Sequence, residues 1–270
     1  MERIYREMWE ETGDLSPENF KNEVKQKHFG KITIQTGENL VTKKQFFTLF
    51  SAVDLFNNAE QKHNLSVEIS ECLKVLFKKY DVKSDSKILV VGLGNDKITA
   101  DSLGCKVVDK LIVTSHAYNE MGVRTKFGNL CAIKSGVSGV TGIESFDLIS
   151  SAVRTVKPDL IIAVDTLSCG KSERLGCTVQ LTDNGIEPGA GVNNAKKKLT
   201  VESLKTPIVA IGVPFVIYIK TILGEFGVKK TTDKLSDLIV TAKEIDFLIG
   251  DYSDVIADAV NFAVHAKKIS

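Results

Sequence analysis

The stretch KILVVGLGNDKITADSLG, residues 87–104, decides the fold class of this chain. It begins with a run of Ile, Leu and Val that ends at Gly92 and Gly94, and Asp101 follows shortly after. A short apolar run of this kind is typical of a strand that is buried on both faces, as in a parallel sheet. The turn after it has two interpretations: a nucleotide-binding loop, or a turn that presents a carboxylate for chemistry.

Four more apolar runs of the same kind follow along the chain. They are KLIVTS (110–115), DLIIAVDT (159–166), TVQLTD (178–183) and PIVAIGVP (207–214). Amphipathic segments lie between them, such as ESFDLISSAVRTV (144–156), whose apolar residues recur at helical spacing. Strands that alternate with helices predict an α/β fold with a mostly parallel sheet flanked by helices. In such sheets the sites lie at the carboxyl ends of the strands.

The remaining segments predict further elements on both sides of this region. KITIQT (31–36) alternates like a short strand, and residues 43–60 and 66–80 favour helices. Helices are also expected around residues 215–226, 235–249 and 253–267. Because no repeat or Pro-rich linker divides the chain, we expect a single α/β domain over residues 1–270, with 1–30 as a candidate N-terminal extension or propeptide.

Composition excludes several classes of protein. The 270 residues carry a formal net charge of +1, so bulk electrostatics gives no reason to expect a nucleic-acid or membrane partner. No apolar run approaches the roughly 18 residues of a membrane span, and the N-terminus has no signal-peptide core. The five cysteines form no C-x-x-C pair, which predicts reduced thiols in the cytoplasm.

The nucleotide interpretation of residues 92–97 is weak. A dinucleotide fingerprint requires a third glycine where Lys97 stands, and the Gly-Lys-Ser/Thr of a Walker loop is absent. A tight turn between strand and helix explains the two glycines, because glycine adopts backbone conformations that other residues avoid. That explanation does not account for Asp101.

Two aspartates follow apolar runs, Asp101 after the first and Asp165 at the end of DLIIAVD. Each has a structural alternative: Asp165 as the N-cap of a following helix, and Asp101 in the first turn of one. At neighbouring strand ends, however, the two would form a pair. Close carboxylates cannot both ionise easily, so one serves as acid and the other as base. Such a pair activates water for attack on an amide.

Two glycine-rich segments are candidate substrate-binding loops, SGVSGVTGIES (135–145) and QLTDNGIEPGAGVNN (180–194). Their backbone N–H groups can hold an oxyanion or a peptide main chain. The alternative is an irregular surface loop. The residues expected to support or bind substrate are Gly94, Asn95, Gly139, Gly142, Asp183, Gly185, Glu187 and Gly189.

A metal site is the third interpretation of the two aspartates. Cys105 and Cys169 each follow one of them at the same spacing, so an Asp/Cys cluster is conceivable. No histidine lies at ligand spacing, and Cys is often a small buried residue. We therefore assign no metal ligand and expect no cofactor.

Several segments resemble the germination protease (spore protease) family of endospore-forming bacteria, over roughly residues 85–265. The motifs occur in the family's order. They are VVGLGNDKITADSLG (90–104), SGVSGVTGIES (135–145), the long block from KPDL to KKKLT (157–200), PIVAIGVPFVI (207–217), AKEIDFLI (242–249) and SDVIADAVNFAVH (253–265).

The resemblance implies a specific activity. The family is one of atypical aspartic endopeptidases that hydrolyse small acid-soluble spore proteins early in germination, in the spore core. Its fold is similar to that of the hydrogenase-maturation proteases (a phosphorylase/hydrolase-like fold), its members are made as zymogens, and they assemble as tetramers. The family's proposed catalytic aspartates correspond to Asp101 and Asp165. The motif that contains Asp183 is also shared, and we assign that residue a supporting role.

The chain departs from the family pattern at several positions. Ala100 stands where the family usually has Pro, and Ser102 and Thr166 stand where it has Ala. Asn184 and Glu187 replace a usual Thr and His, and Glu187 adds a negative charge. Two alternatives therefore stay open: a divergent relative that binds peptide or spore protein without cleaving it, and a metal-dependent hydrolase.

Overall fold

The computed structural model describes most of the chain, with gaps. The described residues are 20–26, 32–39, 41–51, 58–121, 127–188, 197–228 and 238–265.

The described strands form one nine-stranded sheet in the order β1-β2-β3-β7-β8-β6-β4-β5, with β9 paired to β8. The strands are β1 (Phe20–Gln26), β2 (Thr33–Asn39), β3 (Gln45–Phe50), β4 (Lys87–Gly92), β5 (Asn129–Lys134), β6 (Leu160–Ser168), β7 (Thr178–Thr182), β8 (Ile208–Tyr218) and β9 (Ile239–Thr241). Strands β5, β4, β6 and β8 are mutually parallel, and every other pair is antiparallel. The sheet is therefore mixed, with a parallel half extended by an antiparallel half.

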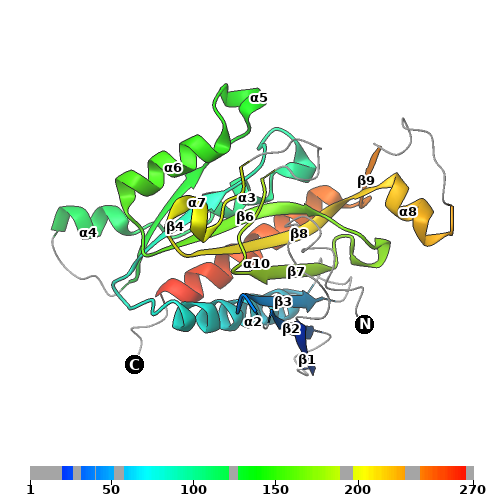
Figure 1. Cartoon of the computed structure of the whole chain (residues 1–270), viewed down its shortest axis with the longest axis horizontal. Coiled ribbons are helices and arrows are strands. Elements are labelled where there is room, and N and C mark those ends of the chain that lie inside the picture. The colour runs from blue at the N-terminus through cyan, green and yellow to red at the C-terminus, as the bar shows by residue number, and fades with distance from the viewer. Residues whose placement is uncertain are drawn as a thin grey trace.

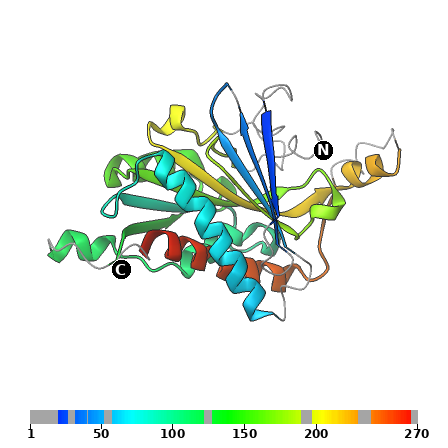
Figure 2. The ribbon, with the colours of Figure 1, turned by 90° about the horizontal axis from the view of Figure 1, so that it is seen from below.

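Helices cover both faces of this sheet (Figures 1 and 2). They are α2 (Ala59–Lys79), α3 (Leu103–Asp109), α4 (Ser115–Met121), α5 (Ser138–Thr141), α6 (Ser145–Val156), α7 (Val201–Leu204), α8 (Ile219–Glu225) and α10 (Ile245–His265), with 3₁₀ turns η3 (Thr99–Asp101) and η4 (Ser172–Arg174). One core cluster joins the sheet to α2, α3 and α10, and a second joins it to α6 and α7. The expected α/β architecture with flanking helices is confirmed. None of the described helices has the length and apolarity of a membrane span.

The structure corrects the prediction of a helix over residues 43–60. Residues Gln45–Phe50 form β3, which pairs with β2 on one side and β7 on the other. The apolar residues Phe46, Phe47 and Leu49 are buried by these long-range contacts, which the local pattern does not reveal. The next helix begins only at Ala59, where the side chain of Asn58 accepts a hydrogen bond from the N–H of Gln61.

The prediction of a strand over residues 110–115 is also wrong. Ile112 and Val113 are exposed in a connection that precedes α4, and the Asn261 side chain on α10 accepts the N–H of Ile112. The strand that pairs with β4 on this side is β5, residues Asn129–Lys134. The apolar run at 110–115 thus serves as a connection that α10 holds in place.

The C-terminal region differs from the three helices predicted there. Strand β8 continues through Tyr218, so α8 begins at Ile219, and β9 occupies part of the second predicted helix. A single long helix, α10, then runs from Ile245 to His265. Thirteen of its residues are buried, so it is a central helix of the core.

Candidate active site

Asp101 is held by the turn that follows β4. The N–H of Asn95 donates to the Asp101 backbone oxygen and to its side-chain Oδ2, both at 2.9 Å. Gly94 has φ of +94°, and a side chain there would collide with the backbone oxygen of Asp101. Glycine is therefore required at position 94. The turn therefore fixes the Asp101 carboxylate at the carboxyl end of β4.

Asp165 lies within β6, not at its end. The sequence interpretation placed it at the end of the strand, or at a helix N-cap, but β6 continues to Ser168. The last pair between β4 and β6 is Gly92 with Val164, and the N–H of Leu93 donates to the Val164 oxygen at 2.9 Å. Asp165 is thus the first β6 residue beyond the end of β4. It is 5% exposed, and its Oδ1 accepts the N–H of Thr166 at 2.8 Å.

Helix packing places both aspartates at one junction. Turn η3, which contains Asp101, contacts β6, and so does α3. Gly104 at the start of α3 lies so close to the sheet that a side chain would collide with the Val164 oxygen and with Leu93. Asp101 and Asp165 therefore flank the point where β4 ends beside β6. The sequence prediction that both lie at this edge of the sheet agrees with the position of the two elements.

The thiol of Cys105 lies beside the turn that holds Asp101. Its Sγ lies 3.8 Å from the Gly94 oxygen and is buried. Burial, together with the nearby carboxylates Asp96 and Asp101, raises the pKa of Cys105 to about 11, against an opposing effect of Lys134. The thiol is therefore neutral near neutral pH. No group of three His, Cys, Asp or Glu side chains suited to a metal ion occurs within the described ranges.

The loop after β5 begins beside the Asp101 turn. The N–H of Ser135 donates to the Gly92 oxygen at 3.0 Å, which ties the start of residues 135–145 to the end of β4. Gly142 ends α5 with φ of +71°. A side chain at Gly139 or Gly142 would meet nothing within 4 Å, so both glycines face open space. Their role as substrate-binding positions stays a prediction.

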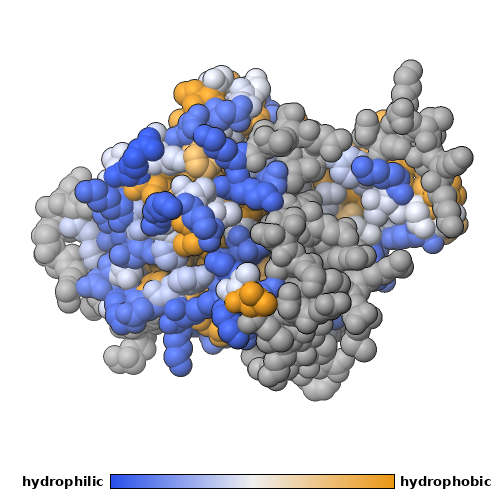
Figure 3. Space-filling view, in the orientation of Figure 1, coloured by the Kyte–Doolittle hydropathy of each residue, from blue (hydrophilic) through white to orange (hydrophobic). Residues whose placement is uncertain are grey.

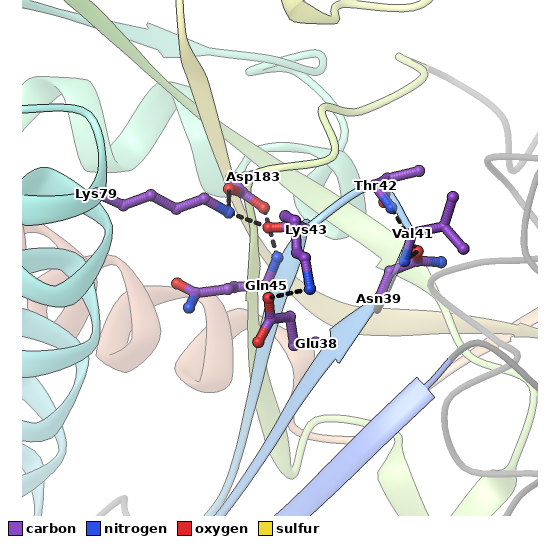
Figure 4. Close-up of polar contacts among 8 residues, drawn as sticks. All are labelled: Glu38, Asn39, Val41, Thr42, Lys43, Gln45, Lys79 and Asp183. Carbon is purple, nitrogen blue, oxygen red and sulfur yellow. Dashed lines mark hydrogen bonds and ion pairs between the residues drawn. The ribbon is translucent and has the colours of Figure 1, made fainter.

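Asp183 lies in a different environment from the pair. It follows β7 and is 1% exposed, and three donors reach its carboxylate, two of which, Gln45 and Lys79, are drawn in Figure 4. The N–H of Gln45 donates to Oδ1 at 2.6 Å, while Lys79 Nζ and the Tyr80 hydroxyl donate to Oδ2 at 2.5 and 2.8 Å. The Lys79 ammonium also donates to the Lys43 oxygen. Asp183 therefore joins the end of β7 to β3 and to the end of α2.

Sheet topology keeps Asp183 away from the other two aspartates. Asp165 is level with Gly212 on β8, which is level with Gln180 on β7. Because β7 is antiparallel to β8, Asp183 lies toward the opposite edge of the sheet. Three residues along a strand and two strand spacings each span about 10 Å, so its Cα is on the order of 14 Å from that of Asp165. The structure does not bring the predicted supporting carboxylate to the pair.

The first part of the loop after Asp183 is attached to residues 198–200. Ile186 and Leu199 exchange backbone hydrogen bonds of 3.0 and 2.8 Å, and Gly185, with φ of +89°, packs against the Leu199 oxygen. Glu187 forms an ion pair with Lys198 at 3.4 Å, which offsets its extra negative charge. Gly189 lies outside the described residues, so its role stays a prediction.

Sequence reasoning missed the groups around these carboxylates. Lys79 and Tyr80 end a helix that is distant in sequence from Asp183, and no motif connects them. The hydroxyl of Thr166 is buried beside Asp165, and no described group hydrogen-bonds to it. The one indication in the sequence was that Thr166 follows the carboxylate Asp165 inside an apolar run.

The amino-acid sequence of the chain is similar to those of known proteins. A family model described as germination protease matches residues 7–227, which include both aspartates of the junction. The germination protease of Oceanobacillus iheyensis is 31% identical over 86% of this chain and 82% of its own. That of Bacillus subtilis is 30% identical over 90% and 86%, and that of Clostridium acetobutylicum is 32% identical over 84% and 81%.

Proposed function

The chain belongs to the germination protease family, and from that premise we propose that it hydrolyses small acid-soluble spore proteins with Asp101 and Asp165 as its catalytic pair. Membership makes the chain a peptidase of spore germination. The observation that supports the finer proposal is the location of both carboxylates at the junction where β4 ends beside β6.

The proposed mechanism is general acid–base catalysis by two carboxylates. Two close carboxyl groups share one proton, because both cannot ionise easily at short range. The ionised group takes a proton from water, which attacks the scissile amide, and the protonated group donates to the leaving nitrogen. Asn95 and Thr166 position the pair, since their backbone N–H groups bind the two carboxylates.

The first prediction tests this pair directly. Asp101→Asn and Asp165→Asn keep the shape of each side chain but remove the proton transfer, so we expect each to lower kcat by about 100-fold or more. Purified protein is incubated with a small acid-soluble spore protein, and the fragments are followed by intact mass spectrometry. Far-UV circular dichroism checks that both variants are folded.

Two outcomes would change the proposal. Full activity of either variant contradicts the paired mechanism. A substrate that the wild-type protein binds but does not cut favours the divergent, non-cleaving relative, for which the departures at Asn184 and Glu187 are the motivation.

Assembly and location belong to the same proposal. We carry over the family's tetramer and its place in the spore core as expectations for this chain. Exposed apolar side chains motivate this expectation: Phe226 ends α8, and Leu238 and Ile239 lie at the start of β9. Both elements lie at one end of the molecule (Figure 1), where Figure 3 shows some hydrophobic surface. Sedimentation equilibrium of the purified chain tests the oligomeric state.

A further inference from the structure

Strand β6 extends beyond its neighbour β4. The ladder between them ends at Gly92 and Val164, whereas the ladder between β6 and β8 continues to Ser168 and Val216. Among the strands that the structure describes, none pairs with β6 beyond Val164 on the side that β4 leaves. Residues 165–168 therefore form a strand edge with which no described strand pairs on one side.

The direction of each backbone group along β6 follows from the hydrogen bonds at its two ends. The Val164 oxygen accepts from Leu93 on the β4 side, and the N–H of Cys169 donates to Val216 on the β8 side. Successive residues of a strand direct their backbone groups to opposite neighbours. The backbone groups of Thr166 and Ser168 therefore face the open side.

One of these groups is already used by the candidate site. The N–H of Thr166 donates to Asp165 Oδ1. The carboxylate therefore takes the place of the backbone oxygen that a neighbouring strand would offer to this N–H. The oxygen of Thr166 and the N–H of Ser168 are the next two backbone groups that face the open side. In a parallel ladder, a single residue of the next strand bonds to both of these groups.

We propose that the substrate polypeptide binds as an extended strand along this edge, in the space that a continuation of β4 would occupy. This inference rests on the proposed function and adds how the substrate is held. One substrate residue donates its N–H to the Thr166 oxygen and accepts from the Ser168 N–H. Strand addition of this kind takes its affinity from main-chain hydrogen bonds and is a common mode of peptide recognition.

The surroundings of the edge suit an extended main chain. The edge begins at Asp165, and η3 with Asp101 contacts the same strand, so a bound main chain passes beside both carboxylates. Open strand edges are usually blocked in stable proteins, and one retained next to paired carboxylates fits a binding role.

The test is an N-methyl scan of the substrate. A fluorescent peptide that spans the cleavage site of a small acid-soluble spore protein competes with variants in which one backbone N–H at a time is methylated. Strand pairing predicts a period of two: methylation weakens binding about tenfold at one position and little at the next. A scan without alternation overturns the inference.

A change in the protein gives an independent readout. Ser168→Pro removes the N–H that faces the open side, a place where strands tolerate proline. It is compared with Ser168→Ala, which changes the same side chain but keeps the N–H. We expect KM for the peptide to be about tenfold higher in the proline variant than in the alanine variant. Equal KM values in two folded variants contradict the inference, and if the proline variant does not fold, the scan decides.

The outcomes separate this inference from the proposed function. If the protein cleaves the substrate but the N-methyl scan shows no alternation, strand binding is overturned and the proposed protease activity stands. An alternating scan of binding without cleavage supports strand binding and overturns the catalytic proposal. Absence of both binding and cleavage overturns both.

Discussion

The carboxylate of Asp183 connects three segments at the residue scale. It accepts hydrogen bonds from the β3 backbone, from Lys79 and from Tyr80, while the residue itself is almost completely buried. A buried carboxylate is tolerated only when donors and an opposite charge compensate for lost hydration. These contacts indicate that Asp183 stabilises the fold rather than the paired site.

The second prediction concerns this carboxylate. Asp183→Ala leaves the Lys79 ammonium and two other donors without their acceptor, so the free energy of unfolding should fall by about 3 kcal/mol. Glu71→Ala is the matched control, because its ion pair with Lys74 on α2 is exposed and should change stability by less than about 1 kcal/mol. Urea denaturation measures both, and equal effects would contradict the assignment.

The third prediction is a pH dependence from Tyr80. Burial, followed by the charge and hydrogen bond of Asp183, raises the pKa of Tyr80 above its ordinary value. The unfolded chain loses this proton near pH of about 10, so above that pH the folded state binds more protons and the free energy of unfolding falls. The contribution is fully present at lower pH.

Tyr80→Phe isolates that contribution. The wild-type protein should lose stability more steeply than the variant between about pH 9 and about pH 11. Tyr252 also has a raised pKa, but it is present in both proteins and cancels in the comparison. If the free energy of unfolding falls equally with pH in both proteins, the raised pKa of Tyr80 is contradicted.

At the scale of elements, the site depends on how closely α3 approaches the sheet. Gly104 lets the helix lie against the Val164 oxygen and Leu93, at the junction that separates Asp101 from Asp165. The same close approach recurs at Gly92, where a side chain would collide with the Gly104 backbone. Two glycines facing each other therefore set the distance between α3 and β4.

The fourth prediction compares two helical glycines. Gly104→Ala should lower the free energy of unfolding by about 2 kcal/mol, because the methyl group collides with backbone that cannot move aside cheaply. Gly250→Ala on α10 meets nothing within 4 Å and should instead stabilise the protein by about 1 kcal/mol through helix propensity. Thermal unfolding of both variants gives the sign of each change in stability. Stabilisation by Gly104→Ala would contradict the close approach of α3 to the sheet.

At the scale of the whole molecule, α10 completes the core although the family match ends at residue 227. Its residues from Leu248 to Val264 pack against α2 and α3 and share one core cluster with residues of the sheet. Figure 2 shows α10 and α2 crossing the same face of the sheet. The segment beyond the matched region thus provides much of one face of the core.

The fifth prediction follows from that position. A chain that ends after Val228 exposes the apolar surface that α10 covers. Each Å² of that surface loses about 25 cal/mol of hydrophobic stabilisation. We expect it to lack a cooperative unfolding transition and near-UV circular dichroism, and to be digested by protease under conditions where the full chain survives. A sharp transition near that of the full chain would show that α10 is dispensable for folding.

The sequence by itself determined the class of the fold and the candidate pair. Buried strands near residues 87, 160 and 208 are evident as apolar runs, and the helix at 145–156 as a helical period, because both signals are local. The general rule that sites lie at the carboxyl ends of parallel strands then selects Asp101 and Asp165.

Only the tertiary structure decided which strands are neighbours and where each one ends. Residues 45–50 become a strand because β2 and β7 pair with them, and Asp183 joins α2 and β3 because β7 runs antiparallel to β8. The open edge of β6 exists because β4 turns away at Leu93. Strand pairing and register depend on contacts between residues far apart in the chain, and no local pattern of side chains contains them.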